Sequence, residues 1–144
     1  MKKLFFVLMV FAVTFAVYGQ QSSSREARYI LFPPNSANLR AVSAQQAIIN
    51  LEVFTQVARI LVDNPQYRLL IDGHANAVTS TSQEETSALR PLSRQRAEVT
   101  ATFIAEYFDI DRQRIIISGA GGGFPFSSTD GSQNRRVSFF FITP

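Results

Sequence analysis

The sequence of 144 residues contains no cysteine and a single histidine, His74. Without cysteine the chain forms neither a disulfide framework nor a thiolate metal site. A zinc site needs three or four converging ligands, and one histidine does not supply them. The histidine follows Gly73 at the end of an apolar run, where an imidazole usually makes a local hydrogen bond. We therefore predict a structural role for His74, with no metal and no catalytic base.

Motifs for covalent catalysis and phosphate binding are also missing. No G-x-S-x-G occurs, and the glycine run 119–123 (GAGGG) lacks the third glycine of a dinucleotide fingerprint, because that position holds Phe124. A loop and then a strand are expected after this run, so no helix N-terminus is placed to receive phosphate. The sequence predicts no enzyme and no cofactor.

One long hydrophobic run is present, from Leu4 to about Val17, and it follows Lys2 and Lys3. This layout is typical of a secretory signal peptide over residues 1–19, cleaved after Gly19. The alternative is a membrane anchor, but the run is short for a span of about 20 residues. No cysteine near the junction offers a lipoprotein attachment point. Residues 20–27 read as a polar tether.

Charge gives little support for a nucleic-acid partner. Lys2 and Lys3 are the only lysines, so cleavage would leave twelve arginines against 11 acidic residues. The mature chain would be nearly neutral. After cleavage we expect no membrane span.

The remaining residues, 28–144, predict one domain of alternating strands and helices. β-forming residues and flanking prolines or glycines predict strands at 28–32, 68–72, 114–118 and 135–143. Apolar spacings of three and four predict one helix from Ser43 to Asp63 and another starting near residues 91–93. The inward stripes are Ala47, Ile48, Leu51, Phe54, Ala58, Leu61 and Val62, then Ala97, Thr100, Ala101, Ile104 and Phe108. Residues 79–88 are predicted to be a mobile loop.

The order βαβαββ predicts an α+β two-layer sandwich, a mixed sheet with both helices on one face. The last strand places Val137, Phe139 and Phe141 on one face, with Ser138, Phe140 and Ile142 on the other. The second face stays partly apolar. Burial within the chain is the favoured interpretation, and a protein partner is the alternative.

Arginines gather where the second helix begins, at Arg90, Arg94 and Arg96, and before the last strand, at Arg135 and Arg136. A helix N-terminus favours anions, so cations there suggest a bound anion. A guanidinium matches a carboxylate bidentately. The alternative is ordinary solvated surface charge.

These segments resemble the OmpA-like peptidoglycan-associated domain over residues 28–142. The motifs are ILFPPNSANL, LLIDGHAN, LSRQRAEVTATFI, RIIISGAGGGFP and NRRVSFFFI, in that order. The resemblance implies a periplasmic module that binds the peptide stem of peptidoglycan without covalent chemistry. It also implies association with the cell wall or outer membrane.

In that family an arginine of the L-S-x-x-R-A motif holds a carboxylate of diaminopimelate, and an aspartate after G-H holds its ammonium. The resemblance assigns the first role to Arg96. The second position is Asn76, because GHAN stands where GHTD is usual. Backbone amides near Asn76 and Ala77 are expected to assist. Losing the charge is expected to weaken the ammonium contact about 5- to 30-fold.

Other positions also depart from the family pattern. Leu89 replaces a frequent asparagine, and the usually polar loop after the first strand begins with Pro33-Pro34, ahead of Asn35. We take Asn35, Leu89 and Arg135 as secondary site candidates. The sequence therefore predicts peptidoglycan binding, weak or to a modified stem peptide. The alternative is an envelope scaffold that has lost this ligand and binds a protein through the aromatic sheet face.

Overall fold

The computed structural model of the chain describes residues 28–77 and 83–144. The predicted signal peptide (1–19) and tether (20–27) lie outside the described residues. The elements follow the predicted order βαβαββ, and the bounds of the strands and of the first helix match within one residue. The α+β two-layer sandwich is thus confirmed.

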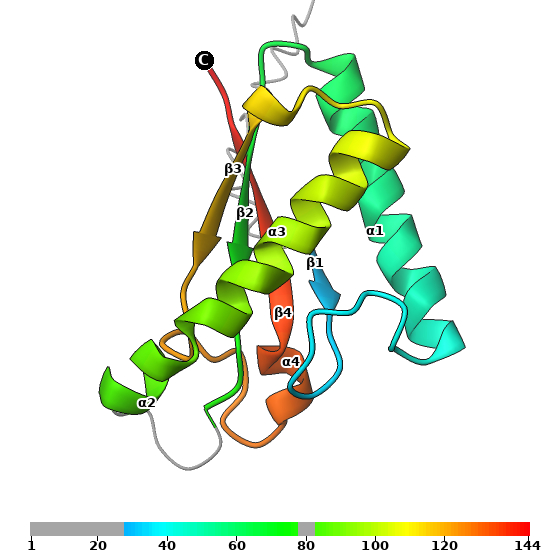
Figure 1. The fold of residues 1–144 in the computed structure, drawn as a ribbon. Helices are drawn as coiled ribbons and strands as arrows, with labels where there is room; N and C mark the ends of the chain where they lie inside the picture. The colour runs from blue at the N-terminus through cyan, green and yellow to red at the C-terminus, as the bar shows by residue number, and fades with distance from the viewer. Residues whose placement is uncertain (1–27, 78–82) are drawn as a thin grey trace, which may run out of the picture.

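Four strands form one mixed sheet in the order β1-β4-β2-β3. β4 (Arg136–Ile142) lies between β1 (Arg28–Leu31) and β2 (Arg68–Gly73) and runs antiparallel to both. β3 (Ile115–Gly119) pairs with β2 in parallel. As a result the ends of β1, β2 and β3 and the beginning of β4 meet at one edge of the sheet, at the bottom of Figure 1.

Two long helices, α1 (Ala44–Asp63) and α3 (Arg90–Tyr107), cover the same face of the sheet (Figure 1). Ser43 caps α1, accepting a hydrogen bond from the backbone N–H of Gln46 at 3.2 Å. The core lies between the helices and this face, because alternate strand residues point into it. Its most deeply buried members are Ile30, Val57, Leu61, Leu69, Ile71, Ala97, Ala101, Ile104 and Val137.

The inward face of α1 differs from the predicted stripe. Ile48, Leu51 and Val62 are exposed, whereas Asn50 and Val57 are buried. The reason is the amide of Asn50, which donates to Leu31 O at 3.0 Å and accepts from Leu31 N at 3.2 Å. Phe54, Ala58 and Leu61 of the predicted stripe are buried as expected, so the prediction is right in part. The inward face is shifted toward Asn50, whose amide pairs with the free edge of β1. The predicted stripe of α3 is confirmed at Ala97, Thr100, Ala101 and Ile104.

Two short helices occur where loops were predicted. Residues 83–88 form α2 (Gln83–Ala88), so the loop prediction for 79–88 is wrong there, and the rest of it falls largely outside the described residues. Glu84 and Glu85 in the first turn favour that helix end electrostatically. α2 buries no side chain, which explains why it carries no apolar stripe. α4 (Gly131–Asn134) interrupts the loop before β4, and η1 (Arg112–Arg114) precedes β3.

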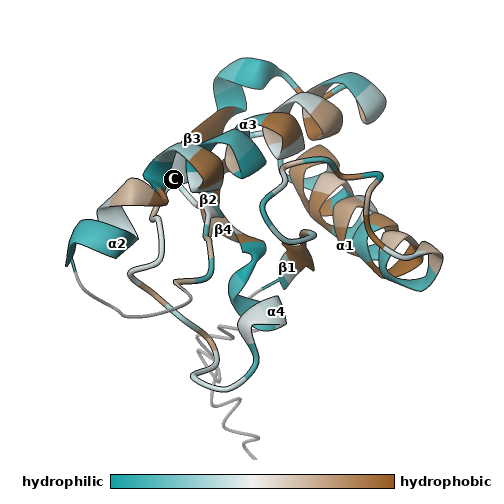
Figure 2. Cartoon of the chain, turned by 60° about the horizontal axis from the view of Figure 1, so that its bottom comes forward, coloured by the Kyte–Doolittle hydropathy of each residue, from teal (hydrophilic) through white to brown (hydrophobic). Residues whose placement is uncertain are grey.

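Figure 2 brings forward the end of the molecule where α2, α4 and the loop after β1 surround the sheet edge. The first turn of α3 also lies there. In the described part of the chain, no helix is both long and apolar enough to span a bilayer.

Candidate functional site

A small pocket of about 120 Å³ opens at this end of the sheet. Four chain segments meet around it: the loop after β1, the loop after β2, the start of α3 and the residue before β4. The lining residues are Pro34, Asn35, Ala75, Asn76, Leu89, Leu92, Arg96 and Arg135. Five of the six predicted site residues therefore lie together: Asn35, Asn76, Leu89, Arg96 and Arg135.

Arg96 is fully buried, at 0% exposure, yet no carboxylate neutralises it among the described residues. Its Nε, Nη1 and Nη2 atoms donate to the carbonyls of Ser36 (2.9 Å), His74 (2.8 Å) and Pro33 (3.0 Å). Burial, with a smaller contribution from Arg135, lowers the pKa of Arg96 to about 10. The guanidinium stays charged at neutral pH, so the pocket offers a fixed, partly desolvated positive charge to an anion.

The close approach of α3 to β2 places Arg96. A Cβ at Gly73 would lie 1.8 Å from the carbonyl oxygen of Ser93, so only glycine permits this contact. Ser93 is fully buried, donates through Oγ to Arg90 O and accepts from Gly121 N, both at 2.9 Å. The backbone N of Ala97 would also lie 3.3 Å from that Cβ. The contacts thus explain the serine and the arginine of the L-S-x-x-R-A motif, and Ser93 is a positioning residue that we did not predict.

Asn76 is held by Asn134. Asn134 Oδ1 accepts from the backbone N–H groups of Phe126 (2.6 Å) and Ser127 (3.0 Å), so its Nδ2 faces the other way. That Nδ2 donates to Ser127 O at 2.7 Å and to Asn76 Oδ1 at 3.0 Å. The carbonyl that we expected to receive an ammonium therefore already accepts a hydrogen bond, which leaves it one lone pair.

No acidic side chain of the described residues lines the pocket. Glu84 and Glu85, the acidic residues that follow the loop after β2 in the sequence, lie on α2 and are not lining residues. Residues 78–82 contain no acid in their sequence either. Among the described residues, the pocket thus presents a buried guanidinium and no negative charge in its lining.

The remaining predicted residues divide between the pocket and its surroundings. Asn35 adopts the left-handed conformation at φ 47° in the loop after β1. Arg135 donates to Phe32 O at 3.3 Å and faces the same pocket. Ala77 packs beside Gly122 and is not a lining residue. Arg90 and Arg94 are exposed, so the anion interpretation of the arginine cluster rests on Arg96 and Arg135.

His74 has no metal partners. The described residues contain no group of three or more histidine, aspartate or glutamate side chains able to hold an ion. Its Nε2 lies 3.3 Å from Asp72 Oδ2, its backbone N–H donates to Arg136 O, and its carbonyl accepts from Arg96. The predicted hydrogen bond goes to Asp72 rather than to the turn.

The model of the OmpA family matches residues 31–138, more than half of the chain. The chain therefore belongs to the OmpA family. A comparison with curated protein sequences gives no significant match.

Solved structures share the fold at low sequence identity. The peptidoglycan-associated lipoprotein from Burkholderia pseudomallei aligns with a TM-score of 0.63 and 19% identity, over 80% of this chain and 90% of that one. The OmpA-like domain of FopA1 from Francisella tularensis subsp. tularensis SCHU S4 gives 0.61 and 19%, over 80% and 71%. The C-terminal domain of Helicobacter pylori MotB gives 0.58 and 16%, over 80% and 85%.

Proposed function

We propose that this chain is a non-catalytic envelope module that binds the stem peptide of peptidoglycan through a carboxylate. Buried Arg96, with three donors fixed on backbone carbonyls and no anionic partner among the described residues, carries this proposal. Arg135 adds a second positive charge at the rim. Membership of the OmpA family and the fold shared with a peptidoglycan-associated lipoprotein support this ligand class.

Backbone donors complete the proposed carboxylate site. Within the described residues, the N–H groups of Asn76 and Ala77 make no hydrogen bond to the protein. An incoming carboxylate oxygen would accept from them while another oxygen faces Arg96. Charge-assisted hydrogen bonds of this kind contribute about 1.5–3 kcal/mol each.

The ammonium end of a diaminopimelate stem would meet Asn76 without a countercharge. The proposed binding is therefore weak for the unmodified stem, or directed to a stem whose amine is changed. Export by the segment 1–19 would place the module in the periplasm, at the cell wall or outer membrane.

Sedimentation of the purified protein with insoluble peptidoglycan tests this function. The variants are Arg96→Ala and Arg135→Ala, with Arg94→Ala as an exposed control on the same helix. Because Arg135 makes one backbone hydrogen bond at the rim, Arg135→Ala remains informative if Arg96→Ala does not fold. We expect binding by the wild type and Arg94→Ala, and loss in both other variants. Equal sedimentation of all four would contradict the proposal.

A second candidate is an interaction domain that has lost peptidoglycan. The engaged carbonyl of Asn76 and the absence of acids in the lining favour it. Binding that occurs only after Asn76→Asp would support this candidate over the first.

A further inference from the structure

A second, larger hollow of about 550 Å³ lies on the sheet face opposite α1 and α3. It shares no lining residue with the first pocket, whose lining residues belong to the loops at the end of the sheet and to α3. Its volume falls in the usual range for small-molecule sites, about 300–1,000 Å³. The lining residues are Asp72, His74, Phe124, Phe126, Arg136, Ser138 and Phe140.

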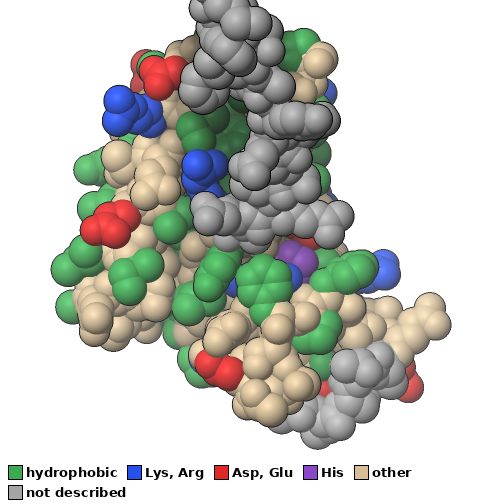
Figure 3. Space-filling view, turned by 180° about the vertical axis from the view of Figure 1, so that it is seen from behind, with side chains coloured by type: hydrophobic (Ala, Val, Ile, Leu, Met, Phe, Trp, Pro, Cys, Tyr) green, Lys and Arg blue, Asp and Glu red, His purple; other side chains and the backbone are tan. Residues whose placement is uncertain are grey.

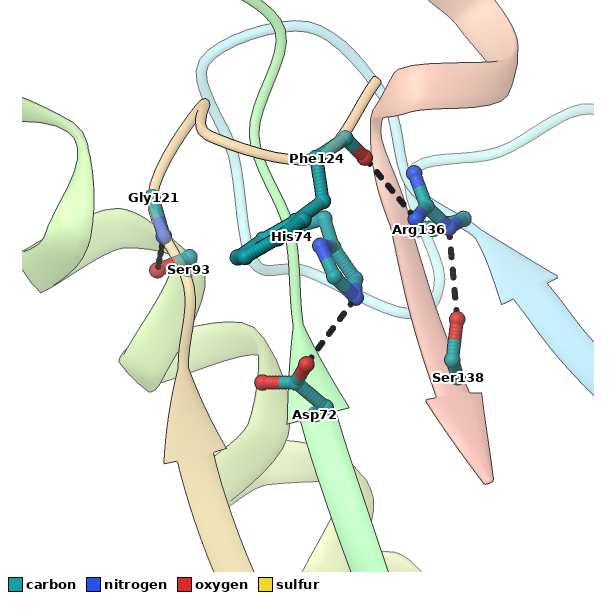
Figure 4. A network of polar contacts seen from close by, with 7 residues as sticks. All are labelled: Asp72, His74, Ser93, Gly121, Phe124, Arg136 and Ser138. Atoms are coloured by element: carbon teal, nitrogen blue, oxygen red, sulfur yellow. Dashed lines mark hydrogen bonds and ion pairs between the residues drawn. The ribbon is translucent and has the colours of Figure 1, made fainter. Parts of the chain in front are cut away.

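The floor of this hollow contains a buried guanidinium. Arg136 is 3% exposed, and its Nε and Nη2 atoms donate to Ser138 Oγ at 3.2 Å and Phe124 O at 3.0 Å (Figure 4). Its Nη1 is buried and has no hydrogen-bond partner. Burial lowers the pKa of Arg136 to about 10, although Asp72 opposes that effect.

Asp72 on β2 and His74, just after this strand, complete the floor (Figure 4). The 3.3 Å contact between His74 Nε2 and Asp72 Oδ2 places the proton of a neutral imidazole on Nε2, so Nδ1 is an acceptor. Nδ1 and Asp72 Oδ1 are both buried without a partner. Of the four such side-chain atoms in the described residues, three are therefore in this hollow. A buried polar group without a partner is unfavourable, so a ligand that supplies the partner is favoured.

Aromatic rings form the walls. Phe124 is 68% exposed, Phe126 45% and Phe140 44%, which is high for phenylalanine. Phe126 lies over the guanidinium of Arg136, with Cζ 3.4 Å from the ring centroid, and meets Tyr29 edge-on. The rear view in Figure 3 shows the single histidine, in purple, among green hydrophobic side chains.

We propose that this hollow is a second binding site, for an uncharged saccharide ring. The charges of Asp72 and Arg136 cancel, so a carboxylate ligand would be repelled by the first and an amine by the second. A hydroxyl both donates and accepts, and so serves Arg136 Nη1 as well as His74 Nδ1. The apolar face of a pyranose packs on aromatic rings, which the walls supply.

Phe124 controls access to the floor. Its ring lies across His74 in Figure 4, and its exposure leaves it free to swing outward. A sugar that enters beneath the outward-turned ring gives partners to the buried atoms and packs against Phe124, Phe126 and Phe140. The site does not rest on the stem-peptide proposal, because Arg96 is absent from it.

NMR titration of the purified protein tests the site, with the imidazole of His74 as reporter. As the only histidine in the sequence, His74 gives one set of imidazole signals. The probes are tri-N-acetylchitotriose and cellotriose, with phenylacetate and phenethylamine as charged aromatic comparisons. The variants are Phe124→Ala, Tyr107→Ala as an equally exposed aromatic control at 65%, and Arg135→Ala, which alters the stem-peptide pocket without touching His74.

We expect a saturable shift of the His74 signals with at least one trisaccharide. Binding should weaken about tenfold in Phe124→Ala and remain unchanged in Tyr107→Ala. Retained binding in Arg135→Ala would separate this site from the stem-peptide pocket. The proposal is overturned by no shift at about 10 mM saccharide, by tighter binding of either charged probe, or by equal binding in Phe124→Ala.

Discussion

Asn134 fixes the orientation of Asn76, because Asn134 Nδ2 donates a hydrogen bond of 3.0 Å to Asn76 Oδ1. The Oδ1 atom of Asn134 accepts from two backbone N–H groups, which sets the orientation of the Asn134 amide. As long as this loop conformation is retained, with or without ligand, the residue at position 76 must present a hydrogen-bond acceptor to Asn134. A carboxylate also satisfies that requirement, so the structure is compatible with aspartate here.

Asn76→Asp is expected to strengthen binding of a stem peptide that ends in diaminopimelate by about 5- to 30-fold, because a charge-assisted contact to the ammonium is gained. Isothermal titration calorimetry against the soluble stem peptide measures the change. The control is the double variant Asn76→Asp, Arg96→Ala, in which the carboxylate partner is missing. An unchanged affinity in Asn76→Asp would show that the ammonium is held elsewhere.

Gly73→Ala is expected to lower the free energy of unfolding by about 2–3 kcal/mol, since the added methyl would overlap the Ser93 carbonyl and push α3 from β2. Gly123→Ala is the matched control: its Cβ would meet only Ala120 O, at 3.6 Å. We expect that control to change stability by less than about 0.5 kcal/mol. Urea unfolding compares the two, and equal effects would refute the tight α3–β2 contact.

Asp72→Asn is expected to change how the free energy of unfolding depends on pH in the acidic range. Burial raises the pKa of the Asp72 carboxyl, but neighbouring groups, first among them His74, bring it below its ordinary value of 3.8. A depressed carboxyl pKa stabilises the fold above the unfolded-state value, and this stabilisation is lost as pH falls through the folded-state value. Urea unfolding between about pH 6 and 2.5 should therefore show the wild-type advantage over Asp72→Asn disappearing below about pH 4. A pH-independent difference would contradict this reading.

Asn50→Ala is expected to cost about 2–3 kcal/mol, because Leu31 N and Leu31 O would each lose a partner at the edge of β1. Gln56→Ala, at an exposed position of the same helix, serves as control. Chemical unfolding measures stability, and analytical ultracentrifugation checks for self-association through the freed edge. Wild-type stability in Asn50→Ala would show that α1 does not depend on this contact.

Much of the fold was predictable because its signals are local. The apolar spacing of residues 43–63 and 97–104 and the β-rich runs each correspond to one element. The exposed Ile48 and Val62 show where this reasoning fails, because a single amide, Asn50, outweighs several apolar side chains in setting the helix face. α2 was missed because it buries nothing, so no periodicity marks it.

The candidate pocket was predictable only through the family resemblance. Position 76 drew attention because a charge is missing there, whereas Asn134 carries no local signal for its four hydrogen bonds. For the second hollow, one indication was present in the sequence, the aromatic last strand with a partly apolar second face. We favoured burial of that face, yet Phe140 and Ile142 remain 44% and 40% exposed.

The three carbonyls that hold Arg96 come from residues 60, 22 and 63 positions away in the sequence. The positively charged cradle thus exists only after the loop following β1, the end of β2 and α3 have all assembled. Ligand binding therefore requires the folded domain, and any ligand of this pocket shifts the folding equilibrium toward the native state. An added stem peptide should accordingly stabilise the folded state and raise the unfolding midpoint of the whole domain, rather than ordering one loop.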